Sequence, residues 1–345
     1  MKIAVYTIAL NEEKHVERWY ESAKDADYLL IADTGSTDKT IKIAKKLGIN
    51  VIKISVKPWR FDDARNAALA MLPDDIDYCV SMDMDETLSE GWRKCLEKMT
   101  GDNITYKFNV NFRDEAETHP YDIFVNNRIH KRHGFRWHFL MHEALVSNRT
   151  KDYTTEFCEG LEVSHHPDQD KPRDQYNQMI EDAYLEYKDE RYHKYHALQL
   201  MSFGRIEESI KVFKDLLKFK TIDDYERALV YVKLSLLDSK NAVKHLKKSL
   251  KIKVTKDALL ELSVYYLKKE QWHKCYKYAK AGMAIDKYQT GMLVNIISHG
   301  YLLNNIFYTA KHNKKYLKWT KSYKKNKREL NIYSTISHNF EVFKD

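Results

Sequence analysis

The 345-residue chain is predicted to form an α/β domain with a mostly parallel sheet, followed by an all-α domain of helical repeats. Short apolar runs alternate with helix-length segments over roughly the first 115 residues, a pattern typical of βαβ units. From about Asp174 onward the pattern is wholly helical, and similar residues recur there every 33 positions. Such a fixed period indicates stacked helical units.

The N-terminal elements are assigned from the lengths of the apolar runs and from the turn residues between them. Parallel strands joined by helices place the carboxyl ends of the strands at one edge of the sheet, where ligands bind. Strands are expected at residues 3–10, 28–32, 51–55 and 78–82, with further antiparallel strands at 104–112 and 121–129. Helices are expected at residues 15–23, 36–47 and 62–71.

Two series of residues define the helical repeat. A small residue recurs where paired helices approach each other, and a packing residue follows it by four positions. The series are Ser209, Ala242 and Cys275, and Phe213, Leu246 and Ala279. Their spacing is close to that of helical hairpins of the tetratricopeptide type, although the full consensus of that repeat is not met.

The expected domains are therefore an α/β domain at residues 1–172, helical repeats at residues 173–290 and a basic segment at residues 291–345. Within the basic segment, residues 311–328 are rich in lysine and contain Tyr316, Trp319 and Tyr323. This part forms either a helical cap on the repeats or a basic binding arm.

The net charge of +8 hides an uneven distribution along the chain. Residues 1–204 carry 28 Lys and Arg against 36 Asp and Glu, whereas residues 205–330 carry 29 against 12. This asymmetry indicates an anionic partner for the C-terminal half. The alternative is that the lysines only solvate a helical surface.

Several functional classes are excluded by missing sequence features. The four cysteines are scattered without a C-x-x-C pair, and no apolar stretch of about 18 residues or secretion signal occurs. We therefore expect a reduced, cytoplasmic protein without a transmembrane helix. The G-x-x-x-x-G-K-[ST] phosphate loop, the G-x-G-x-x-G dinucleotide motif, the H-E-x-x-H zinc motif and the G-x-S-x-G nucleophile elbow are also absent.

Two carboxylates, Asp83 and Asp85, follow the predicted strand at residues 78–82. Hard oxygen ligands at a strand end can bind a divalent cation together with a nucleotide diphosphate. The alternative is an ordinary acidic loop. A second polar block, Asp33 to Asp38, follows the strand at residues 28–32, where Asp33 could accept hydrogen bonds from a base or ribose. Ser36 or Thr37 is expected to cap the next helix.

At this point the sequence resembles the family-2 glycosyltransferases, over roughly residues 1–170. The blocks that carry the resemblance are Ile8-Ala9-Leu10-Asn11-Glu12-Glu13, Asp33-Thr34-Gly35-Ser36-Thr37-Asp38, Phe61-Asp62-Asp63-Ala64-Arg65-Asn66, Asp83-Met84-Asp85-Glu86 and Arg128-Ile129-His130 … Phe135-Arg136-Trp137 … Met141-His142-Glu143. The helical repeats also match an arrangement known in that family.

The resemblance implies a GT-A fold, with a Rossmann-like nucleotide half, and inverting transfer of a sugar from a nucleotide sugar, with UDP as the expected nucleotide. It places Asn11 and Glu13 beside the nucleotide, Asp33 at its base or ribose, Arg65 at the donor, and Asp83 at the ribose. Asp85 would hold the Mn²⁺ or Mg²⁺ that neutralises the diphosphate leaving group.

The acceptor side of the resemblance centres on Glu143, the expected general base. Burial beside Trp137 would raise its pKa as a base requires, whereas an ion pair with Arg128 or Arg136 is the alternative. Phe139 departs from the family, in which a small residue usually precedes the His-Glu pair.

His165, in the sequence His165-His166-Pro167, is expected to be a third metal ligand, with a packing role as the alternative. His165 fits better than His166 because it follows the apolar run at residues 161–164.

The predicted function is therefore metal-dependent sugar transfer to a macromolecular, anionic acceptor: modified DNA, a glycan or a protein. The alternative is a catalytically inactive transferase-like domain that serves a helical binding scaffold.

Overall fold

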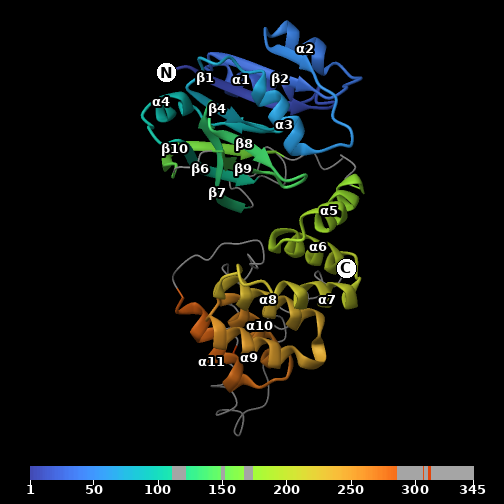
Figure 1. Ribbon diagram of the computed structural model, residues 1–345. Helices are drawn as coiled ribbons and strands as arrows, with labels where there is room; N and C mark the ends of the chain where they lie inside the picture. The colour runs from blue at the N-terminus through green and yellow to red at the C-terminus, as the bar shows by residue number, and fades with distance from the viewer. Residues whose placement is uncertain (111–121, 149–151, 167–173, 286–305, 307–309, 312–345) are drawn as a thin grey trace, which may run out of the picture. The chain divides into compact units, whose positions relative to one another are not determined.

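The computed structural model describes residues 1–110, 122–148, 152–166, 174–285, 306 and 310–311. The chain divides into two compact units, Met1–Lys188 and Asp189–Asp345 (Figure 1). The boundary that we predicted between residues 172 and 173 falls outside the described residues. Helix α5 (Asp174–Tyr187), which we expected to begin the repeats, groups with the first unit.

The first unit contains a mixed, mostly parallel sheet with the strand order β3-β2-β1-β4-β7-β6-β10-β5. Strands β3, β2, β1 and β4 are parallel, β7 is antiparallel to both β4 and β6, β10 is parallel to β6, and β5 is antiparallel to β10. The strands are β1 (Ile3–Ala9), β2 (Tyr28–Asp33), β3 (Asn50–Lys53), β4 (Tyr78–Ser81), β5 (Glu86–Leu88), β6 (Asn103–Val110), β7 (Asp122–Lys131) and β10 (Thr155–His165). A separate hairpin pairs β8 (Phe135–His138) with β9 (Ala144–Ser147).

Strand β1 lies between two hydrophobic cores because successive side chains of a strand point to opposite faces. Ile3 and Val5 pack into a core with residues of α1 (Val16–Ala23), α2 (Thr40–Lys46) and α4 (Trp92–Leu96). Ala4 and Tyr6 pack into the other core with residues of α3 (Phe61–Ala70) and β8. Burial on both faces explains why β1 is an almost continuous apolar run, as expected for a parallel strand.

The predicted parallel strands and the antiparallel pair at residues 104–112 and 121–129 are confirmed in type. The predicted start of the second helix at residue 36 is wrong, because α2 begins at Thr40. The expected cap at Ser36 or Thr37 is not the one observed. Instead, the Asp38 carboxylate accepts a hydrogen bond from the Thr40 N–H at 2.9 Å.

The second unit contains three successive helical hairpins in its described part. The hairpins pair α6 (Glu190–Ser202) with α7 (Ile206–Leu216), α8 (Asp224–Leu237) with α9 (Ala242–Ile252), and α10 (Lys256–Lys268) with α11 (Trp272–Met283). The first helix of each hairpin begins with a side-chain cap, from Asp189, Asp223 and Thr255 respectively. A helical second unit is thus confirmed, while its tetratricopeptide class stays a prediction.

The predicted repeat series lies mainly in the interior of these hairpins. Ser209, Phe213, Leu246, Cys275 and Ala279 are buried, and Ala242 is half-buried. The predicted basic segment at residues 291–345 lies almost entirely outside the described residues.

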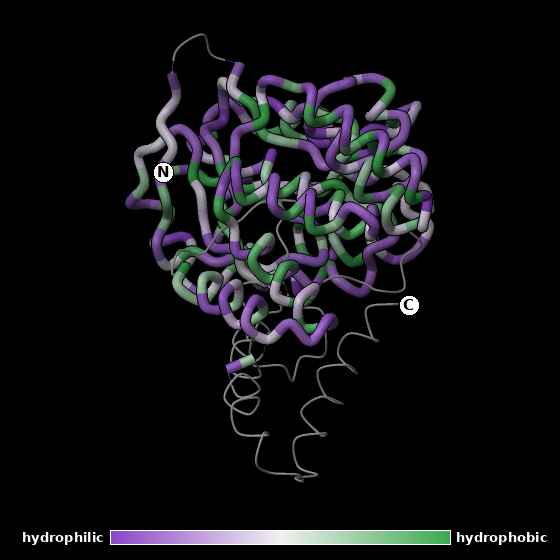
Figure 2. Tube along the Cα trace, turned by 90° about the horizontal axis from the view of Figure 1, so that it is seen from below, coloured by the Kyte–Doolittle hydropathy of each residue, from purple (hydrophilic) through white to green (hydrophobic). Residues whose placement is uncertain are grey.

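Hydrophilic and hydrophobic residues alternate closely along the trace (Figure 2). No helix in the described ranges has the length and hydrophobicity needed to cross a membrane. All four cysteines are described, and each is a free thiol.

Candidate active site

The loops that follow β1 and β2 are joined by hydrogen bonds from backbone to side chain. The Asn11 side chain accepts a hydrogen bond from the Thr37 N–H (2.8 Å), and the Glu13 carboxylate accepts one from the Lys39 N–H (2.9 Å). Asn11 has a φ of 55°, a left-handed conformation that asparagine tolerates better than most residues. Both predicted nucleotide-bordering residues therefore lie at the carboxyl edge of the sheet and hold its two loops together.

Asp33, at the end of β2, closes the turn that follows it. Its side chain is buried and accepts hydrogen bonds from the N–H groups of Gly35 (3.1 Å) and Ser36 (3.2 Å). Gly35 has a φ of 120°, which glycine adopts without a steric penalty. The carboxylate thus shapes the loop beside the expected nucleotide position.

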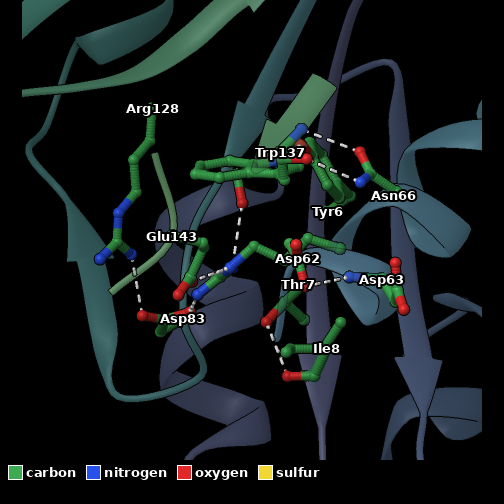
Figure 3. Close-up of polar contacts among 12 residues, drawn as sticks. Tyr6, Thr7, Ile8, Asp62, Asp63, Asn66, Asp83, Arg128, Trp137 and Glu143 are labelled. Atoms are coloured by element: carbon green, nitrogen blue, oxygen red, sulfur yellow. Dashed lines mark hydrogen bonds and ion pairs between the residues drawn. The ribbon is translucent and has the colours of Figure 1, made fainter. Parts of the chain in front are cut away.

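Arg65 is the centre of a buried polar cluster. Its guanidinium donates hydrogen bonds to Asp83 (2.6 Å), to the Ser81 hydroxyl (3.1 Å) and to Glu143. The guanidinium carbon also lies 5.2 Å from the centroid of the Trp137 ring. Because the planar fork of arginine presents several donors at once, one side chain of α3 links the end of β4 to the β8–β9 connection. Figure 3 shows Asp83, Glu143 and Trp137 gathered at this point.

Trp137 is held in place from two sides. The Asn66 side chain accepts a hydrogen bond from the Trp137 N–H (2.8 Å) and donates one to the Trp137 carbonyl (2.9 Å) (Figure 3). The indole N–H donates to the Tyr6 hydroxyl at 2.7 Å, and that hydroxyl lies 3.4 Å from Nε2 of His130. Burial lowers the pKa of His130 to about 4, so this imidazole is neutral at pH 7.

Asp83 lies between two arginines. Besides Arg65, it accepts a hydrogen bond from Arg128 at 2.8 Å. Burial would raise the pKa of Asp83, but the charges of Arg65 and Arg128 outweigh it and hold the pKa well below its usual range. The neighbouring Glu86 carboxylate accepts a hydrogen bond from the Asp83 N–H at 2.8 Å. Burial raises the pKa of Glu86 to about 7, although the charge of Arg128 acts to lower it.

Glu143 follows the turn between β8 and β9, with a side chain only 10% exposed. Burial alone would raise its pKa, as a general base requires. The charges of Arg65 and Arg128 prevail, so the pKa of Glu143 lies below its ordinary value. The ion pair that we considered as an alternative is present, with Arg65 as its partner rather than Arg128 or Arg136. Glu143 is consequently ionised at neutral pH.

Asp85 and His165 meet because β5 pairs with the end of β10, where Glu86 lies opposite His165. The His165 Nε2 lies 3.2 Å from the Asp85 Oδ2, and the Asp85 carbonyl accepts the His166 N–H at 2.8 Å. Burial would lower the pKa of His165, but its contact with Asp85 raises that pKa above its ordinary value. The structure thus brings the two predicted metal ligands together.

This pair fits a divalent cation held by two side chains. Two ligands at about 2.1 Å in adjacent octahedral positions lie about 3 Å apart, close to the 3.2 Å between the Asp85 and His165 atoms. Within the described ranges, no group of three or more His, Cys, Asp or Glu residues is arranged to hold a metal. Water and phosphate oxygens would fill the remaining positions, as is usual for Mg²⁺.

The predicted site residues fall into two groups at the same edge of the sheet. Asn11, Glu13 and Asp33 lie in the loops after β1 and β2, whereas Arg65, Asp83, Asp85, Glu143 and His165 surround the ends of β4, β5 and β10. Arg128 was considered from the sequence only as an ion-pair partner of Glu143, whereas it pairs with Asp83 and Glu86. The sequence feature that could have indicated this contact is the position of Arg128 in β7, next to Ile129. Because Ile129 pairs with Val80 of β4, Arg128 lies near Asp83 and Asp85.

We compared the chain with known protein families, proteins and solved structures. The sequence model of Glycosyl transferase family 2 matches residues 4–152. The matched residues make up less than half of the chain and lie within the first unit. This match agrees with the resemblance inferred from the short motifs, and the C-terminal helices lie outside the match.

The similar proteins include bacterial glycosyltransferases described as uncharacterized. One from Rickettsia bellii is 25% identical over 179 residues, which cover 48% of this chain and 59% of that protein. One from Rickettsia prowazekii is 36% identical over 129 residues, covering 37% of this chain and 40% of that protein. The matched segments thus span less than two thirds of these relatives.

A solved structure of glucosyl-3-phosphoglycerate synthase from Mycobacterium tuberculosis, in complex with Mn²⁺ and UDP-glucose, is also similar in part. It is 27% identical, covers 32% of this chain and 44% of that chain, and has a TM-score of 0.27. At this TM-score the similarity decides nothing about the ligands of the present chain.

Proposed function

We propose that the first unit transfers a sugar from a nucleotide sugar, with UDP as the nucleotide, to a hydroxyl group with inversion at the anomeric carbon. The observation that carries this proposal is the meeting of Asp85 and His165 beside the cluster of Arg65, Asp83 and Glu143. The match of residues 4–152 to the family 2 glycosyltransferase model supports this proposal.

On the donor side, Asn11, Glu13 and Asp33 would border the nucleotide, and Asp83 would contact its ribose. The Asp83 side chain is 31% exposed, whereas its partner Arg65 is 4% exposed. Asp83 therefore presents the accessible part of this ion pair. Arg65 would place the donor diphosphate by moving part of its hydrogen bonding from carboxylates to phosphate oxygens.

Asp85 and His165 would hold Mn²⁺ or Mg²⁺ in the loaded protein. The cation supplies neutralisation of the negative charge that develops on the diphosphate leaving group. Arg65 and Arg128, whose guanidinium groups are already directed at Asp83, would supply fixed positive charge on the same side.

In the chemical step, the acceptor oxygen forms a bond to the anomeric carbon while the bond from that carbon to the diphosphate oxygen breaks. The hydroxyl proton passes to Glu143, the proposed base. Glu143 is ionised and ready to accept a proton, but its ion pair with Arg65 makes it a weak base. When Arg65 turns to the diphosphate, the burial of Glu143 would raise its pKa toward the value that a base needs.

The acceptor side is bordered by aromatic side chains of the first unit. Phe139 has a φ of 84°, a conformation that strains a bulky residue, and its ring lies 5.4 Å from that of Tyr187. The Tyr187 hydroxyl accepts a hydrogen bond from Arg60 at 2.6 Å. Phe139 and Tyr187 are therefore the aromatic residues that we propose for the acceptor side.

We propose a macromolecular, anionic acceptor: modified DNA, a glycan or a protein. The basic second unit, absent from the family match, supports this proposal because a bare transferase domain would have no need of it. The second candidate function is an inactive transferase-like domain that serves the helical unit as a scaffold. The ion pair that restrains Glu143 favours that candidate.

The test is to incubate the full chain with Mn²⁺ and a panel of nucleotide sugars and to measure release of nucleoside diphosphate. Slow hydrolysis of one donor would identify the sugar. Asp85→Ala should abolish release, whereas Asp75→Ala, at an exposed ion pair with Lys2, should leave it unchanged. No release with any donor and no Mn²⁺-dependent UDP binding would refute the transferase and favour the scaffold.

A further inference from the structure

Lysines recur at the same 33-residue period as the buried series, but on the opposite side of the helices. They occupy equivalent positions in the second helix of each hairpin, and we call them the lysine ladder. Its members are Lys211 and Lys214 on α7 with Lys218 in the turn that follows it, Lys244, Lys247 and Lys251 on α9, and Lys277 and Lys280 on α11.

All members of the lysine ladder are exposed. The period explains why: Phe213, Leu246 and Ala279 point into the hairpins and are buried, so residues two before and one after them point outward. Helices α9 and α11 contain no acidic residue. Within the described part of the chain, Lys218 is the one ladder residue that forms an ion pair, with Asp215 at 2.6 Å.

The ladder spreads over an area rather than along a line. Seven residues separate Lys244 from Lys251 on α9, which corresponds to about 10 Å along the helix axis. Neighbouring hairpins are in contact, α7 with α8 and α9 with α10, so the ladder helices follow one another along the row of hairpins. Positive charge is therefore distributed in two dimensions on the second unit.

We infer that the lysine ladder docks the protein on an anionic lipid headgroup surface. A bilayer presents charge over an area and without fixed positions, which suits flexible lysine point charges. Nucleic-acid recognition typically uses arginine forks and exposed stacking rings, and the ladder positions contain neither. This inference does not depend on the proposed sugar transfer.

The test compares binding of the full chain to sedimented vesicles of phosphatidylcholine alone and of phosphatidylcholine with 30% phosphatidylglycerol. The ladder variant is Lys244→Gln/Lys247→Gln/Lys277→Gln/Lys280→Gln. The matched control, Lys220→Gln/Lys240→Gln/Lys253→Gln/Lys269→Gln, removes the same charge from exposed positions outside the ladder. Circular dichroism checks that both variants stay folded.

A lysine near an anionic bilayer contributes about a fivefold change in binding, so the ladder variant should bind acidic vesicles several-hundredfold more weakly than the parent. The control should lose far less, and binding of the parent should fall steeply with salt. Equal losses in both variants, equal binding to neutral vesicles, or tighter binding to a DNA duplex than to acidic vesicles at the same salt would overturn the inference.

Discussion

The buried ion pair between Arg65 and Glu143 makes a quantitative prediction about stability. Glu143→Gln keeps the size of the side chain and an oxygen that can accept the Arg65 hydrogen bond, but it removes the charge. Both side chains are shielded from solvent, at 4% and 10% exposure, so the attraction is only weakly screened. A hydrogen bond to a charged group contributes about 1.5–3 kcal/mol, and we therefore expect a loss of about 2 kcal/mol at pH 7.

The loss should depend on pH in a defined direction. Arg65, Arg128 and Asp83 face Glu143, and the two arginines hold its pKa below the ordinary value of 4.5. A carboxyl with a lowered folded pKa stabilises the folded state above its unfolded pKa, and this stabilisation disappears as pH falls through the folded pKa. The difference between parent and Glu143→Gln should thus be constant from pH 7 to about 5 and shrink below about pH 4.5.

Urea denaturation at a series of pH values measures this difference. Glu97→Gln is the matched control, since Glu97 forms an exposed ion pair with Arg93 one helical turn away. An exposed pair contributes about 0–1 kcal/mol, so the control should change stability little. A difference for Glu143→Gln that stays the same, or grows, between pH 7 and pH 3 would refute the electrostatic account of this site.

Further predictions concern the packing, the helical unit and the metal site. Trp137→Leu should lower the free energy of unfolding by about 3 kcal/mol, because the cation–π contact with Arg65 and the indole hydrogen bond to Tyr6 are lost. A loss of less than about 1 kcal/mol in urea denaturation would contradict this prediction. Asp223→Ala should cost about 1 kcal/mol in thermal or urea unfolding, because the Glu226 N–H loses its cap, and an unchanged curve would count against that cap. His165→Ala should weaken Mn²⁺ binding in the presence of UDP, measured by calorimetry, by at least about tenfold, and equal affinities would remove His165 from the site.

The sequence predicted the parallel core of the sheet well because those strands are buried on both faces. In β1, for example, every residue from Ile3 to Tyr6 is buried, and an apolar run is a direct signal of that environment. Only the last residues of strand β10 were identified from the sequence, because Glu156, Glu159 and Glu162 interrupt its apolar pattern. Its pairing with β6 and β5 is set by the sheet rather than by local preference.

The short motifs located the candidate site residues but not their partners. That Asp85 and Asp83 follow a strand is visible in the sequence, whereas the contact between Asp85 and His165 depends on residues 80 positions apart. An ion pair of Glu143 with Arg128 or Arg136 was the alternative to its role as the general base. It forms with Arg65 of α3, because the Asn66 side chain ties Trp137 and the following turn to that helix. Such long-range packing leaves no local pattern to read.

The position of Arg65 has a consequence for the proposed reaction. Its hydrogen-bond partners come from both sides of the proposed site: Ser81 and Asp83 from the proposed donor side, and Glu143 from the proposed acceptor side. A base paired with a buried guanidinium is a poor proton acceptor, and it becomes a better one only when that cation finds another anion. The donor diphosphate is such an anion. Proton removal from the acceptor would then depend on donor binding, so the same ion pair that stabilises the free protein would prevent activation of the acceptor before a sugar is available to receive it.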